Sequence, residues 1–487
     1  ETDNGGGYPR RTDSAEQYVA YANATIKAMR SVDPTVKIGI ISATGKPVSD
    51  PWNGIVFRQA AKNADFVVVH NYAVGQDTTS PEDLVMRGCM ASDDQFAADF
   101  QAYHAAIRKA LGHDLPIALT EYNGGFDAPT PPYRFSFGAA LFCADLIRVL
   151  LQPENNILLA NYWQGLNGYW GMLRGEGDTW MTMPAYPLRR LWGQHFGKTL
   201  LQCSIQGPTA DFEGVQLVKP ARGTRYIPEK QIAGNLLDLT KLRPSDLSAF
   251  GASVTGGVLS YDLHGTTINQ FPLLAAIPMP ESLSGNGAVF TLSYDIRATP
   301  TGAGQGNLSL GMMDSRGWEA THSAAKIGGA AVDGQWHHYS GVYGSRPDTQ
   351  TADVVVRVED PNPVINAHVE VKNLTVTAST SEIFPAYALV TASASSSADG
   401  KTIYLVAFNK STQQDIPIDV HIQGVPLLGA RRWAVTGPSL GTTNLDAENI
   451  KETETNVVTP ISGGILSPVL PARSMTVFEI QTKGQHS

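Results

Sequence analysis

Cysteines are few and long apolar runs are absent from this sequence of 487 residues. The three cysteines, Cys89, Cys143 and Cys203, are odd in number and widely spaced, which excludes a disulfide framework and matches no zinc-ligand pattern. We expect all three to be buried thiols. The most apolar helical stretch, residues 135–152, contains an aspartate and an arginine and is too interrupted by charge to cross a bilayer. The sequence therefore predicts a core helix there, and no membrane partner.

A surplus of basic residues is also absent. The chain has 36 Lys and Arg against 45 Asp and Glu, a formal net charge of -9, and its basic residues form no runs. These features argue against nucleic acid or an anionic membrane as a partner. Neither of the glycine-rich phosphate loops, GxGxxG or GxxxxGKS/T, follows an apolar segment, so no nucleotide cofactor is expected.

The sequence starts at Glu1, with neither an initiator methionine nor a signal peptide. We interpret this as a sign that the natural N-terminus has been removed. Whether the protein is exported therefore cannot be read from the sequence directly. A chain of this length is expected to form two or three domains, each large enough to bury its own core.

Helical and strand-like patterns alternate along the first part of the chain. We expect helices at residues 14–34, 51–63, 92–112, 141–151 and 186–197, and apolar strands at 36–42, 65–72, 116–123 and 155–164. Asp13 or Ser14 is predicted to cap the first helix, and Ser92 or Asp93 the third. Strands that are apolar throughout and alternate with helices are typical of parallel βαβ units.

Each expected strand becomes polar at its C-terminal end. The polar residues at these ends are Ser42, His70, Tyr72, Glu121, Asn123, Asn161 and Gln164. In a (β/α)8 barrel the strand ends converge on the active site, whereas a doubly wound sheet would normally carry the phosphate loop that this sequence lacks. The predicted fold class is α/β plus all-β, with the second half of a (β/α)8 TIM-type barrel followed by β-rich domains.

Glu121 is the strand-end residue that points to chemistry. It directly follows the apolar residues of the segment LPIALTEYN, where an ionised carboxylate is costly unless it has a role. Retaining hydrolysis of a glycosidic bond needs two carboxyl groups about 5 Å apart, one as nucleophile and one as acid and then base. Glu1 is the candidate for the second, because the glycine-rich stretch after it leads into a helix, as a loop after a barrel strand does.

Four motifs taken together resemble a known family. ETDNGG, VVVHNY, ALTEYN and ILLANYWQGLN, in this order and spacing, look like the second half of the catalytic barrel of glycoside hydrolase family 51, the α-L-arabinofuranosidases and some endoglucanases of clan A. Two later segments, HFGKTLLQC and LPARSMTVFEI, resemble the entry and the last strand of the C-terminal β-sandwich in that family.

The resemblance implies roles for individual residues. The implied catalytic residues are Glu121 (nucleophile) and Glu1 (acid/base), and the implied substrate-binding residues are His70, Tyr72, Asn161, Trp163 and Gln164. The Gly-Asn pair that precedes the acid/base in the family is missing here, as are the first strands of the barrel. The resemblance therefore implies that an upstream fragment or a separate chain of roughly 150 to 250 residues supplies the N-terminal half of the barrel. A free α-ammonium group on Glu1 would lower its pKa, whereas a general acid needs a raised one.

Structural roles are open for the same residues. Glu1 is otherwise a terminal residue without function, and Glu121 a strand-end glutamate in a cap or a salt bridge. His70 is otherwise a core histidine, and Gln164 a residue that holds a loop. The aromatic residues after the last expected strand either line a sugar subsite or anchor a long loop; they are Trp163, Tyr169, Trp170 and Trp180.

From about residue 198, short alternating strands with Gly, Pro, Ser and Thr turns replace the helical patterns. We expect the barrel half at residues 1–197, a β-sandwich at 198–227 and 382–487, and an inserted module at 228–381. The insertion resembles a carbohydrate-binding jelly roll in which a strand such as GQWHHYS precedes the last pair of strands. Sugar binding by Trp318, Trp336 or His337 is one interpretation, and core packing of Trp336 is the other. Such modules sometimes hold a structural calcium ion, but no DxDxDG loop is present.

These inferences together predict a retaining glycoside hydrolase that acts on plant or microbial polysaccharide. The activity expected first is that of an α-L-arabinofuranosidase. No cofactor is expected. An endo-β-1,4-glucanase, a xylanase or a uronidase of the same clan is the alternative, and a uronidase would need a basic residue such as Arg174 for the sugar carboxylate. A non-catalytic carbohydrate-binding protein is the alternative of another class. The resemblance implies a secreted or periplasmic location, and the sequence leaves a homo-oligomer open.

Overall fold

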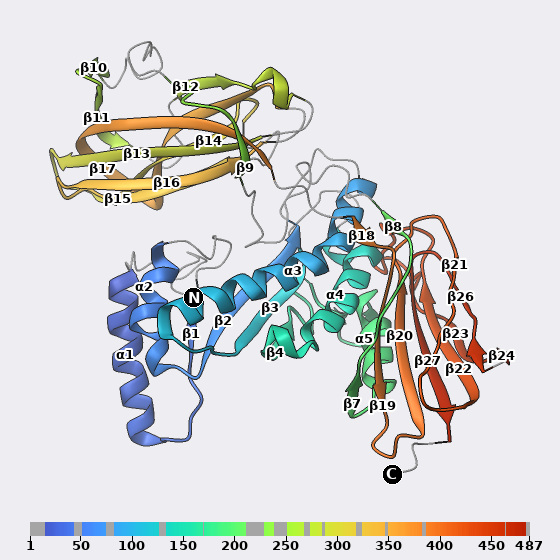
Figure 1. Cartoon of the computed structure of the whole chain (residues 1–487). Helices are drawn as coiled ribbons and strands as arrows, with labels where there is room; N and C mark the ends of the chain where they lie inside the picture. Colours follow the sequence, from blue (N-terminus) through green and yellow to red (C-terminus); the bar gives the residue numbers. More distant parts are fainter. Residues whose placement is uncertain are drawn as a thin grey trace. The chain divides into compact units, whose positions relative to one another are not determined.

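The computed structural model describes residues 15–42, 51–74, 82–125, 133–168, 170–210, 228–237, 251–266, 273–284, 288–317, 324–345, 349–381, 386–462 and 464–483. These residues form two compact units (Figure 1). The first unit holds the described residues up to 210 together with those from 386 onward, and the second holds those from 228 to 381. The second unit thus interrupts the first along the chain.

Helices and parallel strands alternate in the N-terminal part of the first unit. The helices are α1 (Ala15–Val32), α2 (Pro51–Gln59), α3 (Glu82–Leu111), α4 (Phe137–Leu150) and α5 (Ala185–Gln194), with 3-10 turns at Ala61–Asn63, Tyr133–Phe135 and Pro153–Asn155. The strands are β1 (Gly39–Ile41), β2 (Phe66–Val74), β3 (Ile117–Gly125) and β4 (Ile157–Tyr162), which pair in parallel in this order. The expected alternation of strand and helix is therefore present. Most of the observed element bounds differ from the expected ones by only a few residues.

The central strands bury one face of the sheet against the helices, whereas Val68 of β2, on the other face, is only partly buried. Val67, Val69, Ile117 and Leu119 are at most 1% exposed, as expected for a parallel sheet that helices cover. Helix α4 is buried along most of its length, and the Ser136 hydroxyl caps its N-terminus. Side chains of α4 and α5 share one apolar core with residues of the β-rich part of the same unit. The predicted core helix therefore joins the sheet to the rest of the unit.

The expected start of the third helix is wrong. Helix α3 begins at Glu82, so that Ser92 and Asp93 lie inside the helix and are buried. Ser and Asp often cap helices because their side chains accept backbone hydrogen bonds. Here the Asp93 carboxylate instead forms ion pairs with Arg148 and Lys410. A tertiary contact thus explains an acidic residue that the sequence alone would place at a cap.

The C-terminal part of the first unit is all β. Its main sheet is antiparallel with the order β23-β22-β27-β20-β19-β7. The strands are β7 (Thr199–Leu201), β19 (Val390–Ser396), β20 (Thr402–Asn409), β22 (Leu427–Thr436), β23 (Glu452–Thr459) and β27 (Ser474–Thr482). Smaller pairs are β8 (Thr209–Ala210) with β18 (Tyr387–Ala388), β21 (Ile416–Pro417) with β26 (Val469–Leu470), and β24 (Ile461–Ser462) with β25 (Ile465–Leu466). A further hairpin, β5 (Leu173–Glu176) with β6 (Thr179–Thr182), lies between β4 and α5 in the α/β part of the unit.

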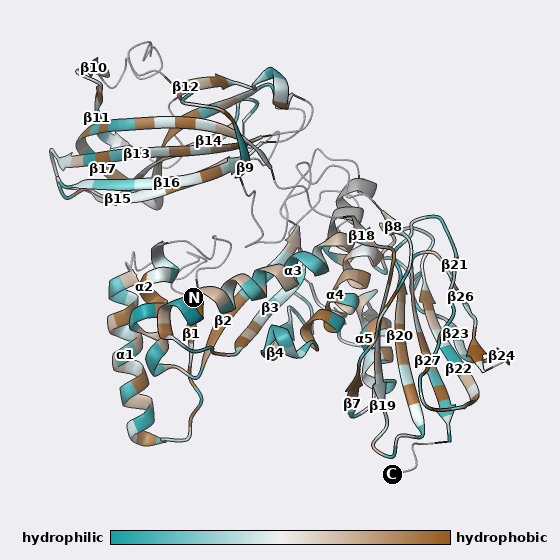
Figure 2. Cartoon of the chain, viewed as in Figure 1, coloured by the Kyte–Doolittle hydropathy of each residue, from teal (hydrophilic) through white to brown (hydrophobic). Residues whose placement is uncertain are grey.

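The second unit is an antiparallel β structure with its own core. Its strands are β9 (Pro228–Ala233), β10 (Ser253–Thr255), β11 (Val258–Thr266), β12 (Leu273–Pro278), β13 (Val289–Pro300), β14 (Gln305–Asp314), β15 (Ala324–Ala331), β16 (Trp336–Gly344) and β17 (Thr351–Ser381), with a 3-10 turn at Glu281–Leu283. Figure 2 shows hydrophobic and hydrophilic residues alternating along these strands, which fits strands buried on one face.

The last pair of strands that we expected in this unit is one long strand. The first part of β17 pairs with β12 and β14, and its later part pairs with β11 and β13. One continuous strand therefore belongs to two sets of partners. The prediction missed this because two prolines and an asparagine, Pro361–Asn362–Pro363, look like a turn in the sequence.

Two composition-based expectations can be checked in the described residues. Cys143 is buried, but Cys203 is exposed, so the prediction of buried thiols is wrong for Cys203. It lies in a stretch without regular structure that follows β7, away from the apolar core. The side chain of Cys89 lies outside the described residues. None of the described helices is long and apolar enough to cross a membrane.

Candidate active site

Glu121 lies in the middle of β3, with its side chain 15% exposed. It is not at the strand end that we expected, because β3 continues beyond it and pairs with β2 as far as Gly125. Its Oε2 atom accepts a hydrogen bond of 2.6 Å from the Tyr72 hydroxyl and lies 3.4 Å from His70 Nδ1. Both partners come from the neighbouring strand β2. The structure therefore brings three of the predicted site residues into contact.

A β-bulge explains why two successive residues of β3 reach the same histidine. Val69 pairs with Leu119, but the next pair is His70 with Glu121, so that Thr120 is the extra residue of β3. Successive side chains of a regular strand point to opposite faces, and a bulge relaxes this rule. His70 Nε2 is hydrogen bonded to Thr120 Oγ1 at 2.8 Å, while Nδ1 faces Glu121. The imidazole is thus fixed at both nitrogens.

Thr120 is a site residue that the sequence analysis missed. It directly precedes Glu121 and looks like an ordinary β-branched strand residue. Only the register of β2 against β3 shows that it contacts His70. No signal in the sequence alone identifies it.

The strand end next to Glu121 also carries predicted site residues. Trp163 follows β4 and is 37% exposed; its backbone N–H donates to the Tyr122 carbonyl, and its carbonyl accepts from Asn123 Nδ2 at 2.5 Å. Asn161 is exposed on β4. The Trp163–Gln164 peptide bond is cis. These contacts tie the end of β4 to β3, beside the position of Glu121.

Gln164 lies against its own loop. Its Oε1 atom is 1.9 Å from the position that a Cβ atom would occupy at Gly168. A side chain at residue 168 would displace the Gln164 amide, and the positive φ of 60° at Gly168 also favours glycine. This placement matches the loop-holding alternative for Gln164, while its role in substrate binding stays a prediction.

Behind Glu121, the next residue of β3 points into the core. The Tyr122 hydroxyl accepts a hydrogen bond from Arg189 of α5, and the Arg189 guanidinium lies over the Tyr162 ring at 5.1 Å. Burial raises the pKa of Tyr122 and raises the pKa of the nearby Cys143 thiol to about 12. Both groups are therefore neutral at physiological pH, which makes them structural supports and unsuitable as acids or nucleophiles.

The aromatic residues after β4 differ in exposure. Trp180 on β6 is 49% exposed, and its indole N–H donates to the Gly177 carbonyl, so that its ring remains accessible. Trp170 is only 3% exposed and stacks on the Tyr72 ring, with centroids 5.5 Å apart. Trp170 is therefore not an accessible wall of a sugar subsite, whereas Trp163 and Trp180 can still serve as one. Tyr169 lies outside the described residues.

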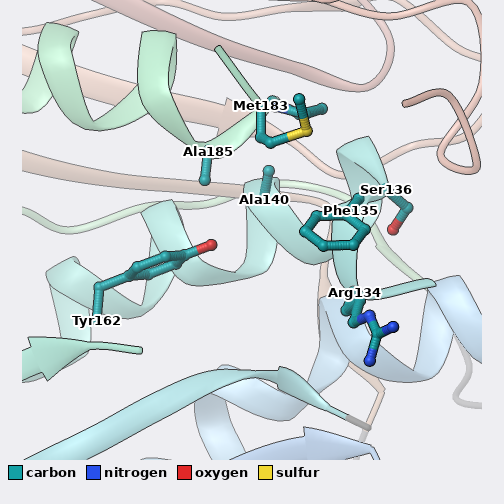
Figure 3. Close-up of a pocket in the computed structure, with 8 residues that line it drawn as sticks. Arg134, Phe135, Ser136, Ala140, Tyr162, Met183 and Ala185 are labelled. Atoms are coloured by element: carbon teal, nitrogen blue, oxygen red, sulfur yellow. The ribbon is translucent and has the colours of Figure 1, made fainter. Parts of the chain in front are cut away.

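A small hollow near the site does not have the size of a sugar pocket. Figure 3 shows its lining by Arg134, Phe135, Ser136, Ala140, Tyr162, Met183, Pro184 and Ala185. Its cavity volume is about 10 Å³, which is room for about one water molecule, whereas ligand pockets usually have about 300–1,000 Å³. None of the predicted site residues lines it, so this hollow adds nothing to the site.

Some predicted residues lie outside the described part of the chain. These are Glu1 and Trp318. In the second unit, Lys372 Nζ and the Arg297 guanidinium lie over the Trp336 ring at 4.0 and 4.8 Å, and His337 pairs with Asp333. Among the residues with described positions, no group of three or more His, Cys, Asp or Glu is placed to hold a metal ion.

One family model matches part of the chain. Residues 8–168 match the model of Glycosyl hydrolases family 39, and this match includes β1 to β4, His70, Tyr72 and Glu121. The sequence motifs resemble family 51, so the matching family model is a different glycosyl hydrolase family from the one expected. No curated protein sequence matches the chain.

Solved structures share the fold of the chain at low sequence identity. The α-L-arabinofuranosidase of Thermotoga maritima in complex with arabinose is 13% identical, with a TM-score of 0.51, over 96% of this chain and 62% of that structure. The family 51 α-L-arabinofuranosidase of Thermotoga petrophila is also 13% identical, with a TM-score of 0.51, over 96% and 63%. The family 51 α-L-arabinofuranosidase of Bifidobacterium longum is 11% identical, with a TM-score of 0.52, over 96% and 64%. The chain thus spans less than two thirds of the length of each of these structures, and its N-terminal region matches a glycosyl hydrolase family model.

Proposed function

We propose that this chain carries the nucleophile of a retaining glycoside hydrolase. The observation that supports this proposal is the partly exposed Glu121 carboxylate on β3, which accepts a hydrogen bond from Tyr72 and faces His70. Hydrogen bonds to the charged form of a carboxylate favour that form, and a nucleophile must be ionised when it attacks. The match of this region to a glycosyl hydrolase family model supports the same assignment.

In the proposed mechanism, Glu121 attacks the anomeric carbon while a second carboxyl group protonates the leaving oxygen. Water then releases the sugar from the glycosyl-enzyme intermediate, and the second carboxylate acts as base. Glu1 is the proposed acid/base on the family 51 resemblance alone. Asn161, Trp163 and Gln164 are proposed to contact the sugar, since they lie on or just after the strand next to β3.

The proposed substrate is an α-L-arabinofuranoside of a plant or microbial polysaccharide. The support is the family 51 resemblance, together with the fold shared with solved α-L-arabinofuranosidases. A uronidase is less well supported, because Arg174 donates to the Gly168 carbonyl and lies over the Phe135 ring at 4.5 Å. A secreted or periplasmic location belongs to this proposal on the resemblance alone.

The first test is the release of 4-nitrophenol from four aryl glycosides: an α-L-arabinofuranoside, a β-D-glucoside, a β-D-xyloside and a β-D-glucuronide. In the native protein, together with whatever segment completes its barrel, we expect turnover of the arabinofuranoside that disappears in Glu121→Ala. Turnover that persists in this variant would contradict the nucleophile assignment. A second substrate set of soluble arabinan, xylan and glucan polymers distinguishes an endo-acting enzyme from a protein that only binds carbohydrate.

We also propose that β1 to β4 are the second half of a (β/α)8 barrel whose first half is supplied by a further polypeptide segment of about 150–250 residues. In the described part of the chain, β4 pairs with β3 alone, and Leu158 and Leu159 on β4 are 53% and 41% exposed. Exposed apolar residues on an edge strand are an aggregation hazard that native proteins usually cover. A stable monomer of this chain alone, with cooperative unfolding, would contradict the proposal.

A further inference from the structure

The loop between β4 and β5 is strongly cross-braced. Met172 N–H donates to the Gln164 carbonyl and Leu173 N–H to the Gly165 carbonyl, while the Asn167 side chain makes two hydrogen bonds of 3.0 Å with the Gly175 backbone. Such a set of contacts fixes the backbone of the loop, because each hydrogen bond restrains residues on opposite sides. The loop is thus built to hold one conformation.

Close packing at a glycine supports the same conclusion. A Cβ atom at Gly171 would lie 2.3 Å from the Asn167 carbonyl oxygen, far inside van der Waals contact. The Asn167 backbone itself has a positive φ of 43°, a conformation that asparagine tolerates better than most residues. The turn at Asn167 and the contact at Gly171 together set the direction of the intervening residue Trp170.

The braced loop directs one large side chain inward. Leu166 is 62% exposed, whereas Trp170, four residues later, is 3% exposed. The Trp170 ring stacks on the Tyr72 ring with an interplanar angle of 29°. Tyr72 is itself 4% exposed and donates the hydrogen bond of 2.6 Å to Glu121 Oε2. A chain of contacts therefore runs from the loop through two aromatic rings to the carboxylate.

We propose that Trp170 is a positioning residue for Glu121. It holds the Tyr72 ring by stacking, so that the phenol hydroxyl stays directed at Glu121 Oε2. The direction of a phenol O–H depends on the orientation of its ring, and hydrogen bonds weaken steeply when the donor angle falls below about 120°. This inference rests on the proposed nucleophile role of Glu121 for its consequence in catalysis, whereas the contact itself can be tested without a substrate.

The test measures the titration of Glu121 in the full chain by ¹³C NMR of glutamate side-chain carboxyl groups, with the resonance assigned from Glu121→Gln. Tyr72→Phe removes the hydroxyl, and we expect it to move the titration midpoint of Glu121 upward by about one pH unit. Trp170→Leu is expected to move the midpoint in the same direction by a smaller amount. The double variant is expected to match Tyr72→Phe alone, because Trp170 acts through that hydroxyl.

The matched control is Leu166→Ala, which changes an exposed apolar residue of the same loop and is expected to leave the Glu121 titration unchanged. Trp170→Phe keeps an aromatic ring and is expected to give an intermediate shift, which preserves the test if Trp170→Leu does not fold. An unchanged midpoint in Trp170→Leu, with a shifted one in Tyr72→Phe, would overturn the proposal. So would an unchanged midpoint in both variants.

Activity gives a second and separate readout. Where an aryl glycoside is hydrolysed, Trp170→Leu is expected to lower kcat about tenfold with a smaller change in KM, as for a weakened charge-assisted hydrogen bond. A loss of stability with unchanged kcat and titration would mean that Trp170 only packs. If no glycoside is hydrolysed by any form, the proposed function fails, and the titration still decides whether Trp170 positions Tyr72.

Discussion

Two groups of carboxylates in the first unit are built in opposite ways. We call Asp93, Asp145, Arg148 and Lys410 the ion-pair cluster; Lys410 Nζ lies 2.8 Å from Asp93 Oδ2 and 2.7 Å from Asp145 Oδ2, and both carboxylates and the ammonium group are 1% exposed. At the candidate site, Glu121 is 15% exposed and its described contacts are a phenol hydroxyl and an imidazole. The carboxylates of the ion-pair cluster are matched by cations in the interior. The Glu121 carboxylate is instead held by a hydroxyl donor where a ligand can reach it.

The location of each group fits this difference. The ion-pair cluster joins α3 and α4 to the residue that follows β20, so that it connects the α/β part of the unit to its β-rich part. Breaking a buried ion pair by removing one partner is costly, because the other charge is left uncompensated. The ion-pair cluster is therefore expected to control stability, and the group around Glu121 to control chemistry.

The largest effect is expected at Glu121. Glu121→Gln keeps the size of the side chain and removes the nucleophile, so hydrolysis of the best aryl glycoside should fall by at least about a thousandfold. The free energy of unfolding should change by less than about 1 kcal/mol, since the residue is partly exposed. Steady-state kinetics and urea unfolding measure the two quantities. A large loss of stability would place Glu121 with the structural carboxylates and break the comparison.

The next effect is expected at Lys410, with the opposite signature. Lys410→Met removes the cation that contacts two buried carboxylates, and we expect a loss of about 3–5 kcal/mol in the free energy of unfolding. Lys401→Met, at an exposed lysine of the same β-rich part, is the control and should change stability by less than about 0.5 kcal/mol. Equal unfolding curves for both variants would show that the ion-pair cluster does not connect the two parts.

The pH dependence of stability is expected to separate the two carboxylates of the ion-pair cluster. Burial, opposed by Lys410 and reinforced by Asp145, raises the pKa of Asp93 to about 7. Burial also acts to raise the pKa of Asp145, but Arg148 and Lys410 outweigh it and hold that pKa well below its usual range.

A raised pKa in the folded state means that Asp93 contributes stability that is fully present below about pH 4 and is lost as the pH rises through about 7. Asp145 contributes in the opposite sense. Its folded-state pKa is lowered, so its contribution to the free energy of unfolding is lost only as the pH falls to strongly acidic values. Asp93→Asn mimics the protonated form, so its urea midpoint should fall less between pH 5 and pH 8 than that of the wild type. Parallel curves for the two proteins over this range would contradict the assignment.

The sequence predicted the alternating helices and strands, because apolar periodicity is a local signal. It placed Glu121 at a strand end, whereas β3 continues to Gly125. It misread Asp93 as a helix cap, since an Asp in a helical pattern looks the same whether it accepts backbone N–H groups or meets a distant lysine. It also missed Thr120, and it left open whether Trp170 lines a sugar subsite or anchors the loop. Both depend on pairing register and loop packing between residues far apart in the chain, which no single segment encodes.

The smallest expected effect compares two threonines, one in each group. Thr120 is hydrogen bonded to His70 at 2.8 Å, and Thr391 donates to Asp145 Oδ1 at 2.8 Å. Thr120→Val should lower kcat by about threefold to tenfold with little change in stability, because the imidazole loses one anchor near Glu121. Thr391→Val should lower the free energy of unfolding by about 1–2 kcal/mol and leave kcat unchanged, since it removes a donor from a buried carboxylate far from substrate chemistry. The same substitution in each group thus separates a role in catalysis from a role in stability. A loss of stability in Thr120→Val together with a loss of kcat in Thr391→Val would contradict the roles assigned to the two carboxylate groups.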